Sequence, residues 1–178
     1  KTLLEGRPDN ISGSAIVCTM EGTRGILAEM QALVTPTGFG NPRRMSSGID
    51  LNRVLLLIAV LEKRGGYYFN NCDAYINIVG GMKLDEPALD LTIAMALVSS
   101  LKDYALRDDV LAFGEIGLAG EIRGVSHCEQ RIKEASRLGF NKCIIPKSNL
   151  KNISASLKSD IEIVGVRTIR EAFEALVL

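Results

Sequence analysis

The stretch KLDEPALDLTIAMALVSS, residues Lys83–Ser100, joins a turn with two acids and a proline to a run that is almost wholly apolar. An apolar run without a polar face predicts a buried helix over residues 87–101, packed between layers of the fold. The proline suits the first helical position, and the acids before it complement the helix dipole. Such a turn also often frames a catalytic nucleophile, yet Ala88 stands where a serine or cysteine would.

Strands are predicted on both sides of this helix. Residues 13–22 and 25–36 are apolar and β-branched, and the turn between them predicts a hairpin. Residues 73–81 predict a strand that leads towards the helix. The other predicted elements are a helix capped by Asp50 and ended by Gly65 and Gly66, two short strands around Gly114 and Gly120, a helix over residues 128–139, strands over 142–146 and 161–166, and a last helix capped by Thr168.

The order of these elements predicts the fold class. Strands that first pair as a hairpin and then alternate with helices indicate an α/β (α+β) domain with a mixed sheet and packed helices. Residues 35–48 are rich in Gly, Pro and Ser and predict a long loop. The length of 178 residues, with 47% apolar residues, suits one domain with a proper core.

Composition excludes several classes of protein. The 21 basic residues balance the 21 acidic ones, so binding to nucleic acid or membrane must use a local patch. No stretch is long and apolar enough to span a bilayer, and no signal peptide opens the chain. The chain starts at Lys1, so we expect a piece of a longer protein. Scattered cysteines without a CxxC pair argue against a metal site and predict buried free thiols at Cys18, Cys72, Cys128 and Cys143.

Few residues are candidates for catalysis. No GxxxxGK(S/T) or GxGxxG motif is present, so a P-loop nucleotide site is excluded and no cofactor site is predicted. His127, the single histidine, is predicted to be a surface or capping residue. Asp85 and Glu86 can act as acid and base, although a helix-dipole role explains them more simply. Asp90 opens an otherwise apolar helix and must cap it, pair with a basic group or serve function.

Several long stretches resemble one known family. MEGTRGILAEMQALVTPTGFGNPRRMSSGIDLNRVLLLIAVLEKRGG, VGGMKLDEPALDL, FGEIGLAGEIRGV and EQRIKEASRLGF are similar to the C-terminal domain of the bacterial RadA (Sms) family of DNA-repair proteins, from about Gly13 to Leu150. That domain is related to the proteolytic domain of Lon, a Ser-Lys peptidase. The resemblance implies a single Lon-protease-like domain over residues 1–178, similar in fold to the second domain of ribosomal protein S5. Residues 1–12 would be a linker from an ATPase core outside this chain.

The same resemblance locates the positions of a peptidase dyad. The Lon pattern around its nucleophile is D-G-P-S-A-G, and residues 85–90 here read DEPALD, so the serine falls on Ala88. The Lon lysine position falls near Glu129. A Ser-Lys dyad needs a hydroxyl to attack and a neutral lysine to take its proton, so the resemblance implies a vestigial, inactive site. Other candidates occupy no matching position: Ser99, Ser126, Lys83 and Lys133.

The family also implies a function for the longer protein. Its members resemble RecA-like, ring-forming motors with a zinc finger and a DNA-dependent ATPase core, which implies ATP, magnesium and zinc as cofactors outside this chain. The Lon-like domain would then scaffold a homo-hexamer and contribute to DNA binding during branch migration of recombination intermediates. The implied partners are duplex or branched DNA, further copies of the chain and the recombinase RecA, in the bacterial cytoplasm.

One basic patch suits DNA. Arg43, Arg44 and Arg53 lie in or beside the loop predicted over residues 35–48, and Arg123 is a further candidate. Exposed cations of this kind contact phosphates with salt-dependent affinity. Phe39 is the single aromatic residue of the loop, which is too few for a stacking platform. The alternative is that these arginines belong to an interface between subunits.

Three functions therefore remain open on the sequence. The first is a non-catalytic scaffold and DNA-contact domain of a repair motor. The second is an active Lon-like peptidase with a relocated nucleophile. The third is a peptide-binding module that uses the vestigial groove.

Overall fold

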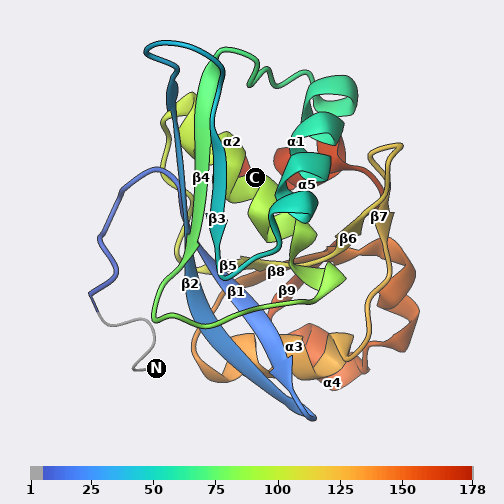
Figure 1. Ribbon diagram of the computed structural model, residues 1–178. Coiled ribbons are helices and arrows are strands. Elements are labelled where there is room, and N and C mark those ends of the chain that lie inside the picture. The colour runs from blue at the N-terminus through green and yellow to red at the C-terminus, as the bar shows by residue number, and fades with distance from the viewer. Residues whose placement is uncertain (1–5, 178) are drawn as a thin grey trace.

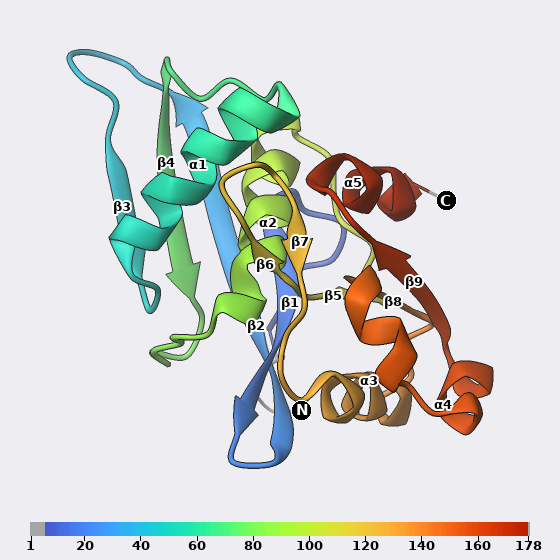
Figure 2. The same cartoon turned by 90° about the vertical axis from the view of Figure 1, so that its right-hand side faces the viewer.

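A computed structural model describes residues 6–177 of the chain (Figure 1). Two layers of strands lie on either side of a central helix, and the views at right angles show the same arrangement (Figure 2). The prediction of a linker over residues 1–12 falls partly on residues 1–5, which lie outside the described residues. Within the described part, Ser12 already pairs with Ala105 in an isolated β-bridge.

The first sheet has four strands in the order β1-β2-β4-β3. The strands β1 (Ser14–Glu21) and β2 (Arg24–Pro36) form the predicted antiparallel hairpin, and β4 (Cys72–Ile78) pairs antiparallel with β2. At the edge, β3 (Arg44–Ser47) runs parallel to β4. This sheet is the predicted mixed sheet, since it contains both antiparallel and parallel pairs.

Two helices cover the inner face of this sheet. Helix α1 (Leu51–Gly65) starts at its predicted cap, Asp50, whose carboxylate accepts a hydrogen bond from the Asn52 N–H at 3.2 Å, and ends at Gly66 in a left-handed conformation. Helix α2 (Asp90–Lys102) follows a 3₁₀ turn, η2 (Pro87–Leu89). The first eleven residues of α2 are all buried, which confirms the prediction of a helix without a polar face.

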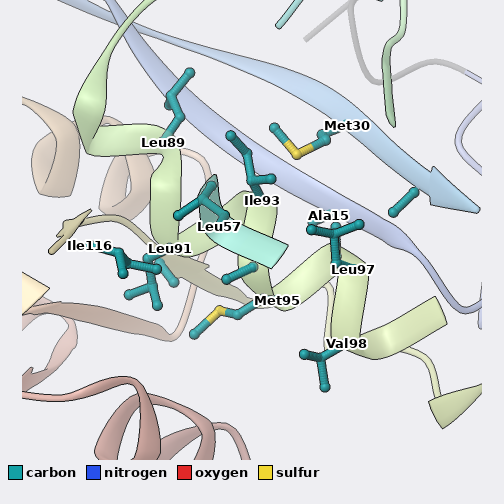
Figure 3. Close-up of a cluster of buried hydrophobic side chains, with 14 of the residues drawn as sticks. Ala15, Met30, Leu57, Leu89, Leu91, Ile93, Met95, Leu97, Val98 and Ile116 are labelled. Atoms are coloured by element: carbon teal, nitrogen blue, oxygen red, sulfur yellow. The ribbon is translucent and has the colours of Figure 1, made fainter. Parts of the chain in front are cut away.

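The central position of α2 explains that burial. Figure 3 shows Ile93 beside Met30 of the sheet and Leu57 of α1. Leu91 lies beside Ile116 of the second layer in the same view. A helix enclosed from both sides needs apolar residues at every turn, which is the pattern of its sequence.

The second layer contains a parallel sheet in the order β5-β8-β9, formed by β5 (Val110–Ala112), β8 (Lys142–Pro146) and β9 (Glu162–Val166). A short hairpin of β6 (Glu115–Ile116) and β7 (Ile122–Arg123) follows β5. The helices of this layer are α3 (Cys128–Arg137), α4 (Ala155–Asp160) and α5 (Ile169–Val177), with a 3₁₀ segment η3 (Lys147–Asn152). The Thr168 hydroxyl caps α5 as predicted, because it accepts a hydrogen bond from the Glu171 N–H at 3.1 Å.

Two features of the fold differ from the sequence-based prediction. Residues 44–47, predicted to lie in a long loop, form the edge strand β3. The prediction failed because four residues are too few to show a period, and the pairing partner β4 is separated from β3 by the whole of α1. The short helix α4 and the segment η3 were also not predicted, since neither has the length at which helical periodicity becomes visible.

The cysteines mostly follow the prediction. All four are free thiols; Cys18, Cys128 and Cys143 are buried, whereas Cys72 is only partly so. Burial raises the pKa of Cys18 and of Cys128 to about 12, so these thiols are unreactive in the folded protein. Over the described residues, none of the helices combines the length and the apolarity needed to cross a membrane.

Candidate functional site: the turn at Ala88 and the arginine loop

The turn that carries Ala88 is fixed by backbone contacts to the second layer. The Ala88 carbonyl accepts a hydrogen bond from the Gly114 N–H at 2.8 Å, and the Leu91 N–H donates to the Gly114 carbonyl at 3.1 Å. Ala88 itself is 3% exposed. Its methyl group is therefore part of the core, and it offers neither a nucleophile nor an opening to solvent.

An ion pair between the buried Arg131 and the partly buried Glu86 lies on the N-terminal side of Ala88. One oxygen of the Glu86 carboxylate accepts a hydrogen bond from Arg131 at 2.5 Å. The other accepts from the Thr19 hydroxyl at 2.5 Å and from the Met20 N–H at 2.8 Å. Burial alone raises the pKa of Glu86, but the hydrogen bonds from Arg131, Thr19 and Met20 outweigh it and lower that pKa below its usual value.

Arg131 is the largest fully buried side chain of the described residues. Besides Glu86, its guanidinium donates to the Cys18 carbonyl at 2.9 Å and the Ser126 carbonyl at 3.2 Å, and it lies 5.8 Å from the centre of the Phe113 ring. It thus connects α3 to β1 and to the turn before Ala88. A guanidinium stays protonated in proteins, so Arg131 cannot take the place of a general base.

A second ion pair lies on the C-terminal side of Ala88. Asp90 is completely buried, and its carboxylate accepts from two nitrogens of Arg53, one of them at 2.7 Å, and from the Ile116 N–H at 3.0 Å. Burial raises the pKa of Asp90, and the hydrogen bonds from Arg53 only partly offset it. The hydrogen bond to Asp90 raises the pKa of Arg53 in turn. Of the three roles open to Asp90, the structure shows pairing with a basic group.

The structure does not bring Glu129 to Ala88. The Glu129 carboxylate accepts a hydrogen bond from the Ser154 N–H at 2.7 Å, at the start of α4. Successive helical residues differ by 100°, so Arg131 lies on the opposite side of α3, and it is Arg131 that reaches the segment before Ala88. The vestigial positions named from the resemblance, Ala88 and Glu129, therefore do not face each other as a dyad would.

The other polar candidates are engaged elsewhere or lie on the surface. The Ser99 hydroxyl accepts from the Gly13 N–H at 2.8 Å and donates to the Tyr104 carbonyl, so it is held by backbone. Lys83 and Lys133 are exposed. His127 is exposed and occupies the cap position of α3 without a side-chain capping bond. Asp85 is exposed and borders two surface pockets, of about 110 Å³ and about 410 Å³.

The four arginines predicted to contact DNA differ in what they touch. The guanidinium of Arg53 is paired with Asp90, and that of Arg123 lies 2.9 Å from the Glu121 carboxylate. The guanidinium of Arg44 donates to the carbonyls of Cys72 and Phe69. Arg43 is exposed, and within residues 6–177 its guanidinium makes no hydrogen bond or ion pair.

Two residues of this region were not predicted from the sequence: Thr19 and Arg131. Arg131 carried a signal, because it lies on the apolar face of α3 with Cys128, Ile132 and Ala135, where an unpaired arginine would be costly. Thr19 carried none, since its role depends on how β1 meets the turn before Ala88. Among the described residues, no group of three or more His, Cys, Asp or Glu side chains is arranged to hold a metal ion.

Comparisons with known proteins give one family model and several relatives that this chain resembles. The family model of the Lon protease (S16) C-terminal proteolytic domain matches residues 61–178. The chain is 50% identical over 171 residues to the DNA repair protein RadA of Halalkalibacterium halodurans, which covers 96% of this chain and 37% of that protein. It is 52% identical over 174 residues to the DNA repair protein RadA of Streptococcus pneumoniae, covering 98% of this chain and 41% of that protein. The chain thus spans about two fifths of the length of the curated relatives it matches.

Proposed function

This chain belongs to the family of the Lon protease (S16) C-terminal proteolytic domain, and we propose that it is a non-proteolytic member that contacts DNA within a DNA-repair ATPase. The observation that carries the proposal is the state of the turn at Ala88. The nucleophile position holds a buried methyl group, and the carboxylates on both sides of it bind arginines. Peptide hydrolysis by a Ser-Lys dyad needs both members, and neither is present.

Because a general base is missing as well as the serine, restoring the serine alone should not restore activity. Ala88→Ser restores a hydroxyl, but the cations that reach this turn are Arg131 and Arg53, and a guanidinium cannot accept a proton. We therefore expect neither the wild-type chain nor Ala88→Ser to cleave an unfolded protein or to react with a serine-directed covalent probe. Labelling of the wild-type chain would refute the proposal and favour a peptidase with a relocated nucleophile.

The DNA-contact part of the proposal is supported by Arg43 and by the relatives, which are DNA repair proteins by name. A neutral chain that binds DNA needs an exposed, unengaged cation, and Arg43 meets that condition. Arg43→Ala should weaken binding to all duplex sequences alike, and the slope of log affinity against log salt should fall by about one for each phosphate that is no longer bound. Arg137→Ala is the matched control, because Arg137 is 61% exposed and pairs with Glu134 on α3. An unchanged salt slope in Arg43→Ala removes this loop from the DNA site.

The wider role rests on the family resemblance alone. We propose that the longer protein is cytoplasmic, forms a homo-hexameric ring and uses ATP, magnesium and a zinc finger to drive branch migration, with RecA as a partner. A closed ring requires one head-to-tail interface repeated around an axis. The particle mass of the longer protein, measured with nucleotide and DNA, tests this; a strictly monomeric protein contradicts it.

A further inference from the structure

Two loops meet at one end of the four-stranded sheet, at the top of the view in Figure 1. One joins β2 to β3 through residues 37–43, and the other joins α1 to β4 through residues 66–71. The Thr37 N–H donates to the Asn71 carbonyl at 2.8 Å. The Arg44 guanidinium donates to the Phe69 carbonyl at 2.9 Å, so a side chain next to the first loop also holds the second.

Each loop presents one aromatic ring to solvent. Phe39 is 99% exposed between Gly38 and Gly40, and Tyr68 is 69% exposed. The neighbours of Tyr68 are turned inward: Phe69 is fully buried, and the ring of Tyr67 lies 5.3 Å from that of Phe173. Because its neighbours anchor the loop, the Tyr68 ring points outward. It is not part of the hydrophobic core.

Hydrogen bonds to two carboxylates fix both loops close to the sheet. The Asp73 carboxylate accepts from the Thr37 hydroxyl at 3.0 Å and from the Arg43 N–H at 2.8 Å, which closes the first loop. The Glu62 carboxylate accepts from the Phe69 N–H at 2.9 Å in the second. Rings presented on ordered loops lose little conformational freedom on binding, which favours affinity.

Charged groups of both signs lie near the rings. Arg43 lies in the first loop, and Lys63 is exposed in the last turn of α1, just before the second. The nearby acids, Asp73 and Glu62, accept hydrogen bonds from backbone N–H groups of the loops and keep their negative charge. The other exposed side chains of the two loops include the amides of Asn41, Asn70 and Asn71. This mixture of cations, amides and isolated rings differs from the apolar core of a subunit interface.

We propose that the two loops bind DNA that has unpaired bases. Arg43 and Lys63 contact phosphates, and the rings of Phe39 and Tyr68 stack on free base faces. Bases inside a duplex are already stacked on both faces, whereas those of a single strand or a branch point are free to stack on aromatic side chains. The inference rests on the proposed DNA contact and names the kind of DNA that this site prefers.

The test compares two single strands with equal numbers of phosphates, one of thymidine nucleotides and one without bases. Fluorescence anisotropy across a salt series gives the affinity and the salt slope of the 178-residue chain for each. Phe39→Ala and Tyr68→Ala should each weaken binding to the thymidine strand by ~5-fold or more and leave the base-free strand unaffected, because stacking needs a base. The salt slope should not change, since both variants keep the cations that bind phosphate. Leu118→Ala is the matched control, an equally exposed apolar residue at 68% exposure on the β6–β7 turn.

The outcomes separate this inference from the proposed function. If both ring variants bind both strands like the wild type while Arg43→Ala still lowers the salt slope, stacking is wrong and the DNA contact stands. If the wild type shows no salt-dependent binding to any DNA, the proposed function fails and this inference with it. If the ring variants reduce the particle mass with unchanged melting temperature, the rings belong to an interface between copies, and the inference is overturned.

Discussion

The turn at Ala88 and the loop end of the four-stranded sheet differ in how their charged side chains are paired. At the turn, both carboxylates next to Ala88 bind arginines, and the pairs are largely removed from water. At the loop end, the carboxylates bind backbone N–H groups, and the cations Arg43 and Lys63 remain exposed. The ion pairs at the turn are part of what holds the domain together, whereas the exposed end has groups able to bind a partner. Charge at the turn should therefore govern stability, and charge at the loop end should govern binding.

The largest expected effect is at Arg131. Arg131→Met should lower the free energy of unfolding by about 3 kcal/mol, because Glu86 then keeps a half-buried charge without its cation and two carbonyls lose a donor. Urea unfolding followed by circular dichroism measures it. Arg137→Met on the exposed side of the same helix should cost less than about 1 kcal/mol. Equal losses in the two variants would contradict a structural role for the buried pair.

The Arg53–Asp90 pair should show an asymmetry. Arg53→Ala leaves a carboxylate that is 1% exposed with the Ile116 N–H as its remaining donor, and about 2 kcal/mol of stability should be lost. Asp90→Asn leaves an arginine that is 31% exposed and can turn to water, so its cost should be smaller. A double-mutant cycle should show that the double variant loses less than the sum of the two. Additive losses would mean that the two side chains do not stabilise each other.

Acid should weaken the turn through Glu86. Its pKa is lowered in the folded state, so the unfolded chain binds the proton more readily in the window between the two pKa values. The contribution of Glu86 is thus fully present above the unfolded pKa of about 4.3 and is lost as the pH falls through the folded value. In Glu86→Gln, the free energy of unfolding should depend less on pH below that value. The same pH dependence in variant and wild type would show that another group causes the acid sensitivity.

The smallest effects on stability should separate two neighbouring arginines. Arg44→Ala removes hydrogen bonds to the Phe69 and Cys72 carbonyls and should cost about 1 kcal/mol. Arg43→Ala should stay within about 0.5 kcal/mol, since its guanidinium forms no hydrogen bond or ion pair with the described residues. On DNA the order should reverse, with a lower salt slope in Arg43→Ala and little change in Arg44→Ala. A lower salt slope in Arg44→Ala alone would contradict this assignment, because the phosphate contact would then belong to Arg44.

Much of the fold was predictable because its signals are local. The apolar run of α2, the Asp50 cap of α1 and the β-branched run of β1 each depend on neighbours within a few residues. The edge strand β3 was missed because its partner β4 lies beyond α1. The candidate site followed the same division: the prediction at Ala88 came from a short motif and stays a prediction, whereas the contacts of Arg131 and Thr19 join distant elements.

Adjacent residues were enough to predict the family and most of the order of the elements, since both depend on short stretches of the chain. The folded structure was needed to show that Arg53 and Arg44 are engaged within the domain and that Arg43 is not. It also brought Tyr68 beside the loop of Phe39, where the sequence shows a single aromatic residue in that loop. The physical reason is that hydrogen bonds and ion pairs extend over a few ångströms in space, while their partners are separated by up to 113 positions in the chain.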